Sequence, residues 1–232
     1  MGDLSNMLVM VFAGWRQAID PRADGVGMMR LTERIRREFQ GRRGHAVLLY
    51  PWDTSPTIPA QAVEALRPRN LVAVAYSYGA GWALPRFAEA LHKHCRGSRI
   101  DLACLIDPVP RWRFAPLRWI SLTRWGAYSV PARVVRVAYW RQVNASPFGR
   151  AVMPADEYAT LRAEAFGTHA MLRRHRLRHE KASASGAVGH DNIDEREDVH
   201  RDILRLIAEQ AGYLRPDKPL VGEPQATEAK GA

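Results

Sequence analysis

Short, uninterrupted apolar runs alternate along the chain with stretches in which apolar residues recur every three or four positions. Uninterrupted runs of this length are typical of strands buried on both faces of a sheet, and the wider spacing is typical of amphipathic helices. The runs predict five strands, at residues 7–13, 46–50, 71–76, 100–106 and 132–139. The spaced stretches predict four helices, at residues 25–39, 57–66, 81–94 and 199–210. Together they predict an α/β fold with a mostly parallel central sheet flanked by helices.

The length of the chain, 232 residues, is enough for one large hydrophobic core. We therefore expect residues 1–214 to form a single domain. Residues 108–131 are too many for an ordinary connection between two strands, and they predict a cap or lid over the domain. Residues 215–232 turn to Pro, Gly, Glu, Gln and Ala, a composition that predicts a disordered tail.

The apolar runs are far too short to cross a bilayer, and no export signal opens the sequence. Two cysteines are present, Cys95 in a helical pattern and Cys104 in a predicted strand. Two cysteines in such places do not make a disulfide framework, so both are expected to be reduced and structural. These features predict a cytoplasmic protein.

The chain is strongly basic, with a formal net charge of +10 and an isoelectric point near 10.2. Such a charge permits nucleic acid, phospholipid or acidic substrates as partners, and it fits a solvated basic surface equally well. The sequence shows neither helix-turn-helix spacing nor basic segments interleaved with aromatic residues. This absence disfavours nucleic acid as the partner.

A serine lies at the junction between a predicted strand and a predicted helix, in the segment AYSYG. A nucleophile on such a tight turn needs small residues two positions before and two positions after it, because the backbone comes very close there. Ala75 and Gly79 meet that requirement around Ser77. The segment resembles the nucleophile turn of the α/β-hydrolase family, in which glycine is commonest at the position of Ala75. The resemblance implies a reduced α/β-hydrolase fold with Ser77 as the nucleophile.

A serine nucleophile needs a histidine base held by a carboxylate. Asp107 ends the strand that follows Ser77 and precedes Pro108, similar to lipases that carry their acid on the strand immediately after the nucleophile. Carboxyl ends of parallel strands share one edge of a sheet, which favours Asp107 as the acid. Asp191 and Asp194 remain alternative acids.

His190 follows a run of small residues and precedes the last predicted helix. The segment GHDNID is similar to a histidine-bearing loop of several small bacterial and phage-type hydrolases, and the resemblance implies that His190 is the base. His175 and His179 have the i, i+4 spacing of metal ligands, but no carboxylate or cysteine cluster completes a site with them. We therefore expect neither a metal ion nor a cofactor.

The resemblance also implies an oxyanion hole made by two backbone N–H groups. One comes from Tyr78, the residue after the nucleophile, and the other from Trp15, where Gly14 lets the chain turn after the first strand. The cap predicted at residues 108–131 overhangs this site. Its tryptophans suit contact with a lipid or an acyl chain, and they are Trp112, Trp119 and Trp125.

These features predict a serine hydrolase of the esterase or lipase type that cleaves a small-molecule ester or thioester. A catalytically inactive hydrolase fold that serves as a binding protein is the first alternative. A basic nucleic-acid-binding protein is the second. Acyl transfer differs from hydrolysis only in the acceptor, so it stays open, as do the acyl length, the leaving group and the oligomeric state.

Overall fold

The computed structural model describes residues 6–15, 17, 27–40, 44–110, 127–131, 133–140, 151–153, 190 and 192–213. Within them a parallel five-stranded sheet has the strand order β2-β1-β3-β4-β6. Its strands are β1 (Met7–Phe12), β2 (Ala46–Tyr50), β3 (Asn70–Tyr76), β4 (Leu102–Ile106) and β6 (Val137–Trp140). Two further strands, β5 (Ala127–Ser129) and β7 (Ala151–Met153), pair with each other in a second sheet.

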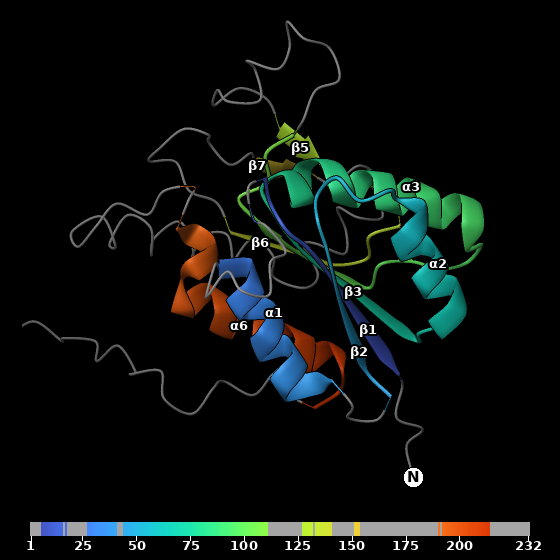
Figure 1. Cartoon of the computed structure of the whole chain (residues 1–232), viewed down its shortest axis with the longest axis horizontal. Coiled ribbons are helices and arrows are strands. Elements are labelled where there is room, and N and C mark those ends of the chain that lie inside the picture. The colour runs from blue at the N-terminus through green and yellow to red at the C-terminus, as the bar shows by residue number, and fades with distance from the viewer. Residues whose placement is uncertain are drawn as a thin grey trace, which may run out of the picture.

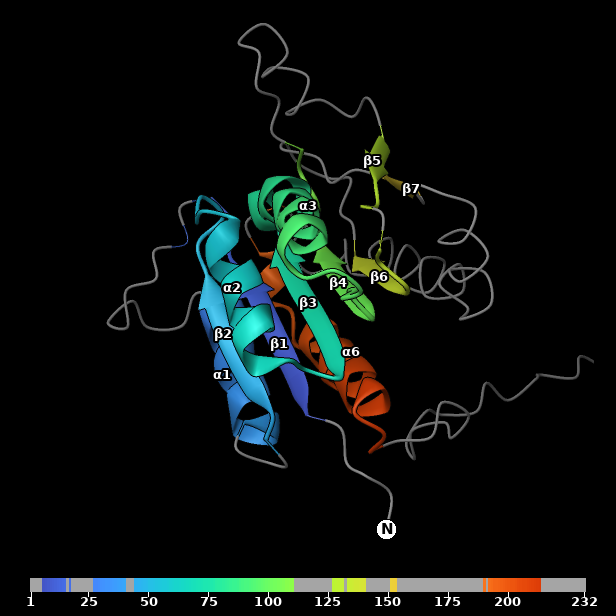
Figure 2. The ribbon, with the colours of Figure 1, turned by 90° about the vertical axis from the view of Figure 1, so that its right-hand side faces the viewer.

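Helices cover both faces of the five-stranded sheet, as Figures 1 and 2 show. One face carries α2 (Thr57–Leu66) and α3 (Leu84–His94), and α3 continues directly from a short π-helical turn, η1 (Gly79–Ala83). The other face carries α1 (Gly27–Phe39) and α6 (Glu197–Gln210), and a 3₁₀ turn, η3 (Ile193–Glu195), precedes α6. The predicted class, an α/β fold with a mostly parallel sheet, is confirmed.

The position of β1 inside the sheet explains why its sequence is apolar without a break. Its six residues are all buried. Leu8, Met10 and Phe12 pack in the core under α2 and α3, and the alternate residues pack in the core under α1 and α6. Because successive side chains of a strand point to opposite faces, a strand covered on both sides has no polar position.

The predicted elements are present, with shifts at their ends. The helix expected from residue 25 begins at Gly27, and the helix expected from residue 81 begins two residues earlier, in the π-helical turn. The strand expected at residues 132–139 is shorter, since only an isolated bridge between Ile100 and Val134 precedes β6. Most of the predicted cap, residues 111–126, and the predicted tail, residues 215–232, lie outside the described residues.

Both cysteines are free thiols buried in the core, in keeping with the reduced state expected for them. Burial raises the pKa of Cys104 to about 12. Of the helices in the described part of the chain, none has the length and apolar character needed to cross a bilayer.

The parallel arrangement brings the carboxyl ends of the strands together at one edge of the sheet. Tyr76 of β3 is in register with Ile106 of β4, and Ile106 is in register with Trp140 of β6. The loops that leave this edge after β1, β2, β3 and β4 therefore meet. Open α/β sheets bind their ligands at this edge.

Candidate active site

Ser77 forms a strained turn between β3 and the helix that follows. Its φ angle is +52°, in the left-handed region that non-glycine residues rarely adopt. The turn is held from both sides. The Ser77 N–H donates to the carbonyl of Ile106 at 3.0 Å, and the Ser77 carbonyl accepts from the N–H groups of Gly81 at 2.9 Å and Val109 at 3.2 Å. Strain of this kind persists only where the surrounding structure fixes it.

The two glycines after Ser77 are required by close backbone contacts. A Cβ on Gly79 would lie 2.7 Å from the carbonyl oxygen of Ala13, and closer still to that of Phe12. A Cβ on Gly81 would lie 2.6 Å from the backbone nitrogen of Pro110. The requirement for a small residue two positions after Ser77, expected from the sequence, thus has a steric cause in the backbone of β1.

Three of the predicted site residues form one continuous chain of hydrogen bonds. Ser77 Oγ lies 2.8 Å from His190 Nε2, and His190 Nδ1 lies 2.7 Å from Asp107 Oδ2. All three residues are buried: the exposed fraction is 4% for Ser77, 7% for His190 and 0% for Asp107. The serine and the histidine are 113 residues apart in sequence, so only the fold brings them together.

This arrangement has a definite chemical capacity. An ionised Asp107 accepts the Nδ1–H of His190 and so fixes the tautomer in which Nε2 is unprotonated. An unprotonated Nε2 at 2.8 Å accepts the hydroxyl proton of Ser77. Asp107 also has a positive φ angle, +43°, and its N–H donates to the carbonyl of Trp140 at 2.6 Å. The carboxylate is thereby fixed at the edge of the sheet, directly behind the imidazole.

Tyr76, a residue that the sequence analysis did not single out, holds His190 in place. Its hydroxyl donates to the backbone carbonyl of His190. The two rings also stack, with centroids 5.1 Å apart and an angle of 25° between their planes. Because side chains alternate along a strand, Tyr76 at the last position of β3 packs under α1 and α6, on the side from which His190 arrives.

The loop after β1 passes directly beside Ser77. A Cβ on Gly14 would lie 2.7 Å from the ring of Tyr76 and 3.0 Å from Ser77 Cβ, so only glycine fits here. Trp15 follows Gly14, and its ring lies 6.1 Å from that of Tyr78. The structure therefore brings Gly14, Trp15 and Tyr78 around Ser77, where the sequence analysis expected the oxyanion hole.

An aromatic surface borders the site. The ring of Trp52, from the loop after β2, lies 5.5 Å from that of Tyr78, which in turn contacts Trp15. Trp15 is 56% exposed although it is a large apolar side chain. The three rings come from the loops after three neighbouring strands. We refer to Trp15, Trp52 and Tyr78 as the aromatic shelf.

The alternative acids are placed differently from Asp107. Asp194 is 1% exposed and accepts a hydrogen bond from Gln17 Nε2, whereas His190 Nδ1 is bonded to Asp107. Burial raises the pKa of Asp194 to about 6, against the opposing effect of the hydrogen bond from Gln17. Asp191 lies outside the described residues. Geometry thus favours Asp107 over Asp194 as the partner of the imidazole.

The remaining predictions concern the cap and metal ions. The three cap tryptophans lie outside the described residues, and they are Trp112, Trp119 and Trp125. The same holds for His175 and His179. Among the residues that the structure does describe, no group of three or more His, Cys, Asp or Glu is placed to hold a metal ion.

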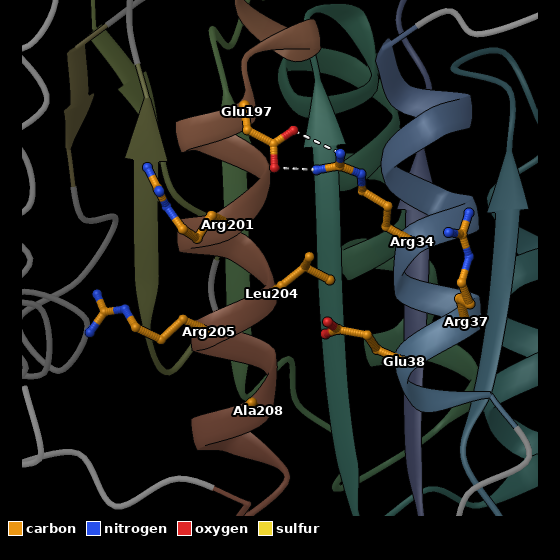
Figure 3. Close-up of a pocket in the computed structure, with 8 residues that line it drawn as sticks. All are labelled: Arg34, Arg37, Glu38, Glu197, Arg201, Leu204, Arg205 and Ala208. Carbon is orange, nitrogen blue, oxygen red and sulfur yellow. Dashed lines mark hydrogen bonds and ion pairs between the residues drawn. The ribbon is translucent and has the colours of Figure 1, made fainter. Parts of the chain in front are cut away.

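A groove of about 470 Å³ runs between α1 and α6 (Figure 3). Basic and acidic side chains line it, and Arg34 of α1 pairs with Glu197 of α6 at 2.7 Å across it. None of the predicted site residues lies in its wall. The groove marks where α1 and α6 are joined.

The molecule is thus an α/β protein with a buried Ser–His–Asp chain at the carboxyl edge of a parallel sheet. Comparisons with models of protein families, with curated proteins and with solved structures found no match.

Proposed function

We propose that the protein is a serine hydrolase of the α/β-hydrolase type that cleaves an ester or thioester. The observation that carries the proposal is the unbroken hydrogen-bonded chain from Ser77 Oγ through His190 to Asp107, on a strained strand-to-helix turn. Such a constellation is recognised by its geometry rather than by its place in the sequence. The reduced α/β-hydrolase fold is part of the same proposal.

In the first half of the reaction, Ser77 Oγ attacks the carbonyl carbon of the substrate while His190 Nε2 takes the hydroxyl proton. Asp107 stabilises the imidazolium cation that results. The N–H groups of Tyr78 and Trp15 donate to the oxyanion of the tetrahedral intermediate. The bond to the leaving group then breaks, and His190 returns its proton to the leaving oxygen or sulfur.

In the second half, a water molecule attacks the acyl-enzyme. His190 takes a proton from that water, a second tetrahedral intermediate forms, and the Ser77 ester bond breaks as the proton passes to Ser77 Oγ. The acid product leaves with the oxygen of the water. The enzyme returns to its starting state without a cofactor.

The aromatic shelf supports a substrate with an apolar portion. Tyr78 is the residue next to the nucleophile, so a molecule whose carbonyl reaches Ser77 Oγ lies within reach of the shelf. The exposed indole ring of Trp15 can bind apolar surface, and such rings also suit the boundary between an apolar phase and water. We propose small apolar acyl esters or thioesters as the substrate class, with contact to a lipid surface through the cap.

Labelling with a fluorophosphonate probe tests the proposal. We expect the wild-type protein to form an adduct that mass spectrometry places on Ser77. Labelling is expected to be abolished in Ser77→Ala and strongly slowed in His190→Ala and Asp107→Asn. Ser55→Ala is the matched control, because Ser55 is exposed and its hydroxyl lies within hydrogen-bond distance of the Thr57 hydroxyl, away from the proposed site residues.

Labelling that persists in Ser77→Ala would overturn the assignment of the nucleophile. If the wild-type protein is not labelled and hydrolyses no ester, the proposal of an enzyme fails, and the inactive binding protein becomes the better explanation. Loss of labelling in Ser77→Ala alone would retain the nucleophile and contradict the roles of His190 and Asp107.

A further inference from the structure

One side chain, Gln17, joins the turn after β1 to the segment that follows His190. Gln17 Oε1 accepts the N–H of Gly14 at 2.9 Å, and Gln17 Nε2 donates to Asp194 Oδ2. The Gln17 N–H also donates to the carbonyl of Gly14 at 3.4 Å, which closes the turn. Gln17 and Asp194 are 177 residues apart in sequence. The amide therefore links the two loops that flank Ser77.

Asp194 is a fixed anchor for this link. Its backbone carbonyl accepts a hydrogen bond from His200 Nε2 at 2.6 Å, on the first turns of α6. A Cβ on Gly27 would lie 2.5 Å from Asp194 Oδ2, so the first residue of α1 is pressed against the carboxylate. The ion pair between Arg34 and Glu197 joins the same two helices (Figure 3). The carboxylate has little room to move.

The hydrogen bond from the Gly14 N–H to Gln17 determines which N–H group of the turn can bind the oxyanion. The Gly14 N–H donates to Gln17 Oε1, so it does not serve the oxyanion. In the proposed function that task belongs to the next N–H along the turn, that of Trp15. The position of this N–H follows the position of Gly14, whose Cα is packed against Ser77.

We propose that Gln17 and Asp194 are positioning residues that hold the Gly14–Trp15 turn in the geometry needed for oxyanion stabilisation. The inference rests on the proposed function. Neither side chain touches the reacting atoms. Both act through the backbone of the turn. Asp194 accepts from the Gln17 amide, and the Gln17 amide oxygen in turn accepts from the Gly14 N–H.

A charge-swap experiment separates this role from simple packing. In Gln17→Glu, two carboxylates face each other, one donor is lost, and the turn is pushed away from its anchor. In Gln17→Glu/Asp194→Asn, the new carboxylate accepts from both the Gly14 N–H and the asparagine amide. The swap restores two hydrogen bonds with the same net charge as the wild type.

We expect kcat for p-nitrophenyl butyrate at pH 8 to fall by about tenfold or more in Gln17→Glu and in Gln17→Ala. Full loss of an oxyanion donor lowers kcat by about 10²- to 10³-fold, so the loss in the Gln17 variants should not exceed that range. The swap variant is expected to recover to within about threefold of the wild type. KM is expected to change little, because the turn acts on the transition state.

Two further readouts exclude a general loss of structure. The pH dependence of kcat/KM should be the same in the Gln17 variants as in the wild type, since Asp107 and His190 are untouched. Hydrogen exchange at the Gly14 amide should speed up by about tenfold in Gln17→Ala and return to the wild-type rate in the swap variant. Glu89→Gln, on the exposed side of α3, is the control for a neutralised carboxylate.

Unchanged kcat in Gln17→Glu, or a swap variant no better than Gln17→Glu, would overturn the inference. The failure of the proposed function is distinct, because it shows itself in the wild type as an absence of labelling at Ser77. If the wild type is labelled and active and the Gln17 variants have the same kcat as the wild type, the proposed enzyme stands and the positioning role of Gln17 is refuted.

Discussion

Replacing Asp107 or Asp194 with asparagine, one at a time, tests which of these two buried carboxylates orients His190. Asp107 Oδ2 lies 2.7 Å from His190 Nδ1 and is fully buried, so an asparagine in its place has no water to turn towards. Its amide N–H would donate to Nδ1. The imidazole would then carry its proton on Nε2, where it cannot accept the hydroxyl proton of Ser77.

The same exchange in a serine protease of known mechanism lowers kcat by about ten-thousandfold for this reason. For Asp107→Asn we expect a loss of about 10³- to 10⁴-fold in kcat, which corresponds to about 4 to 5.5 kcal/mol of transition-state stabilisation. Asp194→Asn should lose less than about tenfold, because an asparagine oxygen still accepts the hydrogen bond from Gln17 Nε2.

The assay is hydrolysis of p-nitrophenyl butyrate from pH 5 to 9, with circular dichroism to show that both variants are folded. Part of the lost activity of Asp107→Asn should return at high pH, where hydroxide replaces the missing base. If Asp107→Asn keeps more than a tenth of the wild-type kcat while Asp194→Asn loses a hundredfold, Asp194 is the acid and the reasoning here is refuted.

Three other results are expected. Burial raises the pKa of Asp194 from 3.8 to about 6, so ionising it costs native stability as the pH rises through that window. Asp194→Asn should therefore gain about 2 kcal/mol over the wild type between pH 4 and pH 7 in urea unfolding, and curves of unfolding free energy against pH that run parallel for the two proteins would contradict this. Gly79→Ala should lower the free energy of unfolding by about 3 kcal/mol, because its Cβ meets the backbone of Phe12; an unchanged urea midpoint would count against the packed turn. Trp52→Ala should lower kcat/KM about tenfold for octanoate but little for acetate esters of p-nitrophenol. Leu66→Ala, at an exposed apolar side chain near the opposite edge of the sheet, should change kcat/KM for neither ester. Equal losses for both esters in Trp52→Ala would contradict a role of the aromatic shelf in substrate binding.

The fold could be predicted because its signal is local. A run such as residues 71–76 is apolar at every position only if both of its faces are covered, and that condition already implies helices on both sides of a sheet. The turn at Ser77 was also visible, since the small residue at 79 meets a steric demand that acts within two positions of the serine.

The supports of the site were not visible in the sequence. Tyr76 holds a carbonyl 114 residues away, and Gln17 reaches a carboxylate 177 residues away. Neither residue carries a motif, because a tyrosine at the end of a strand and a glutamine in a loop are ordinary there. Trp52 was missed for the same reason. Its place in the aromatic shelf depends on the register of β2 against β1, which places its loop beside that of Trp15.

The left-handed backbone at Ser77 and Asp107 has an evolutionary consequence. Glycine would relieve about 1 kcal/mol at each position, so random substitution without selection for chemistry would favour a more stable and inert sequence. In the proposed function Ser77 and Asp107 oppose this drift, because each contributes to catalysis only together with the other and with His190. A lineage that lost the histidine would gain by losing both, and the three positions should therefore disappear together or persist together among descendants of this chain.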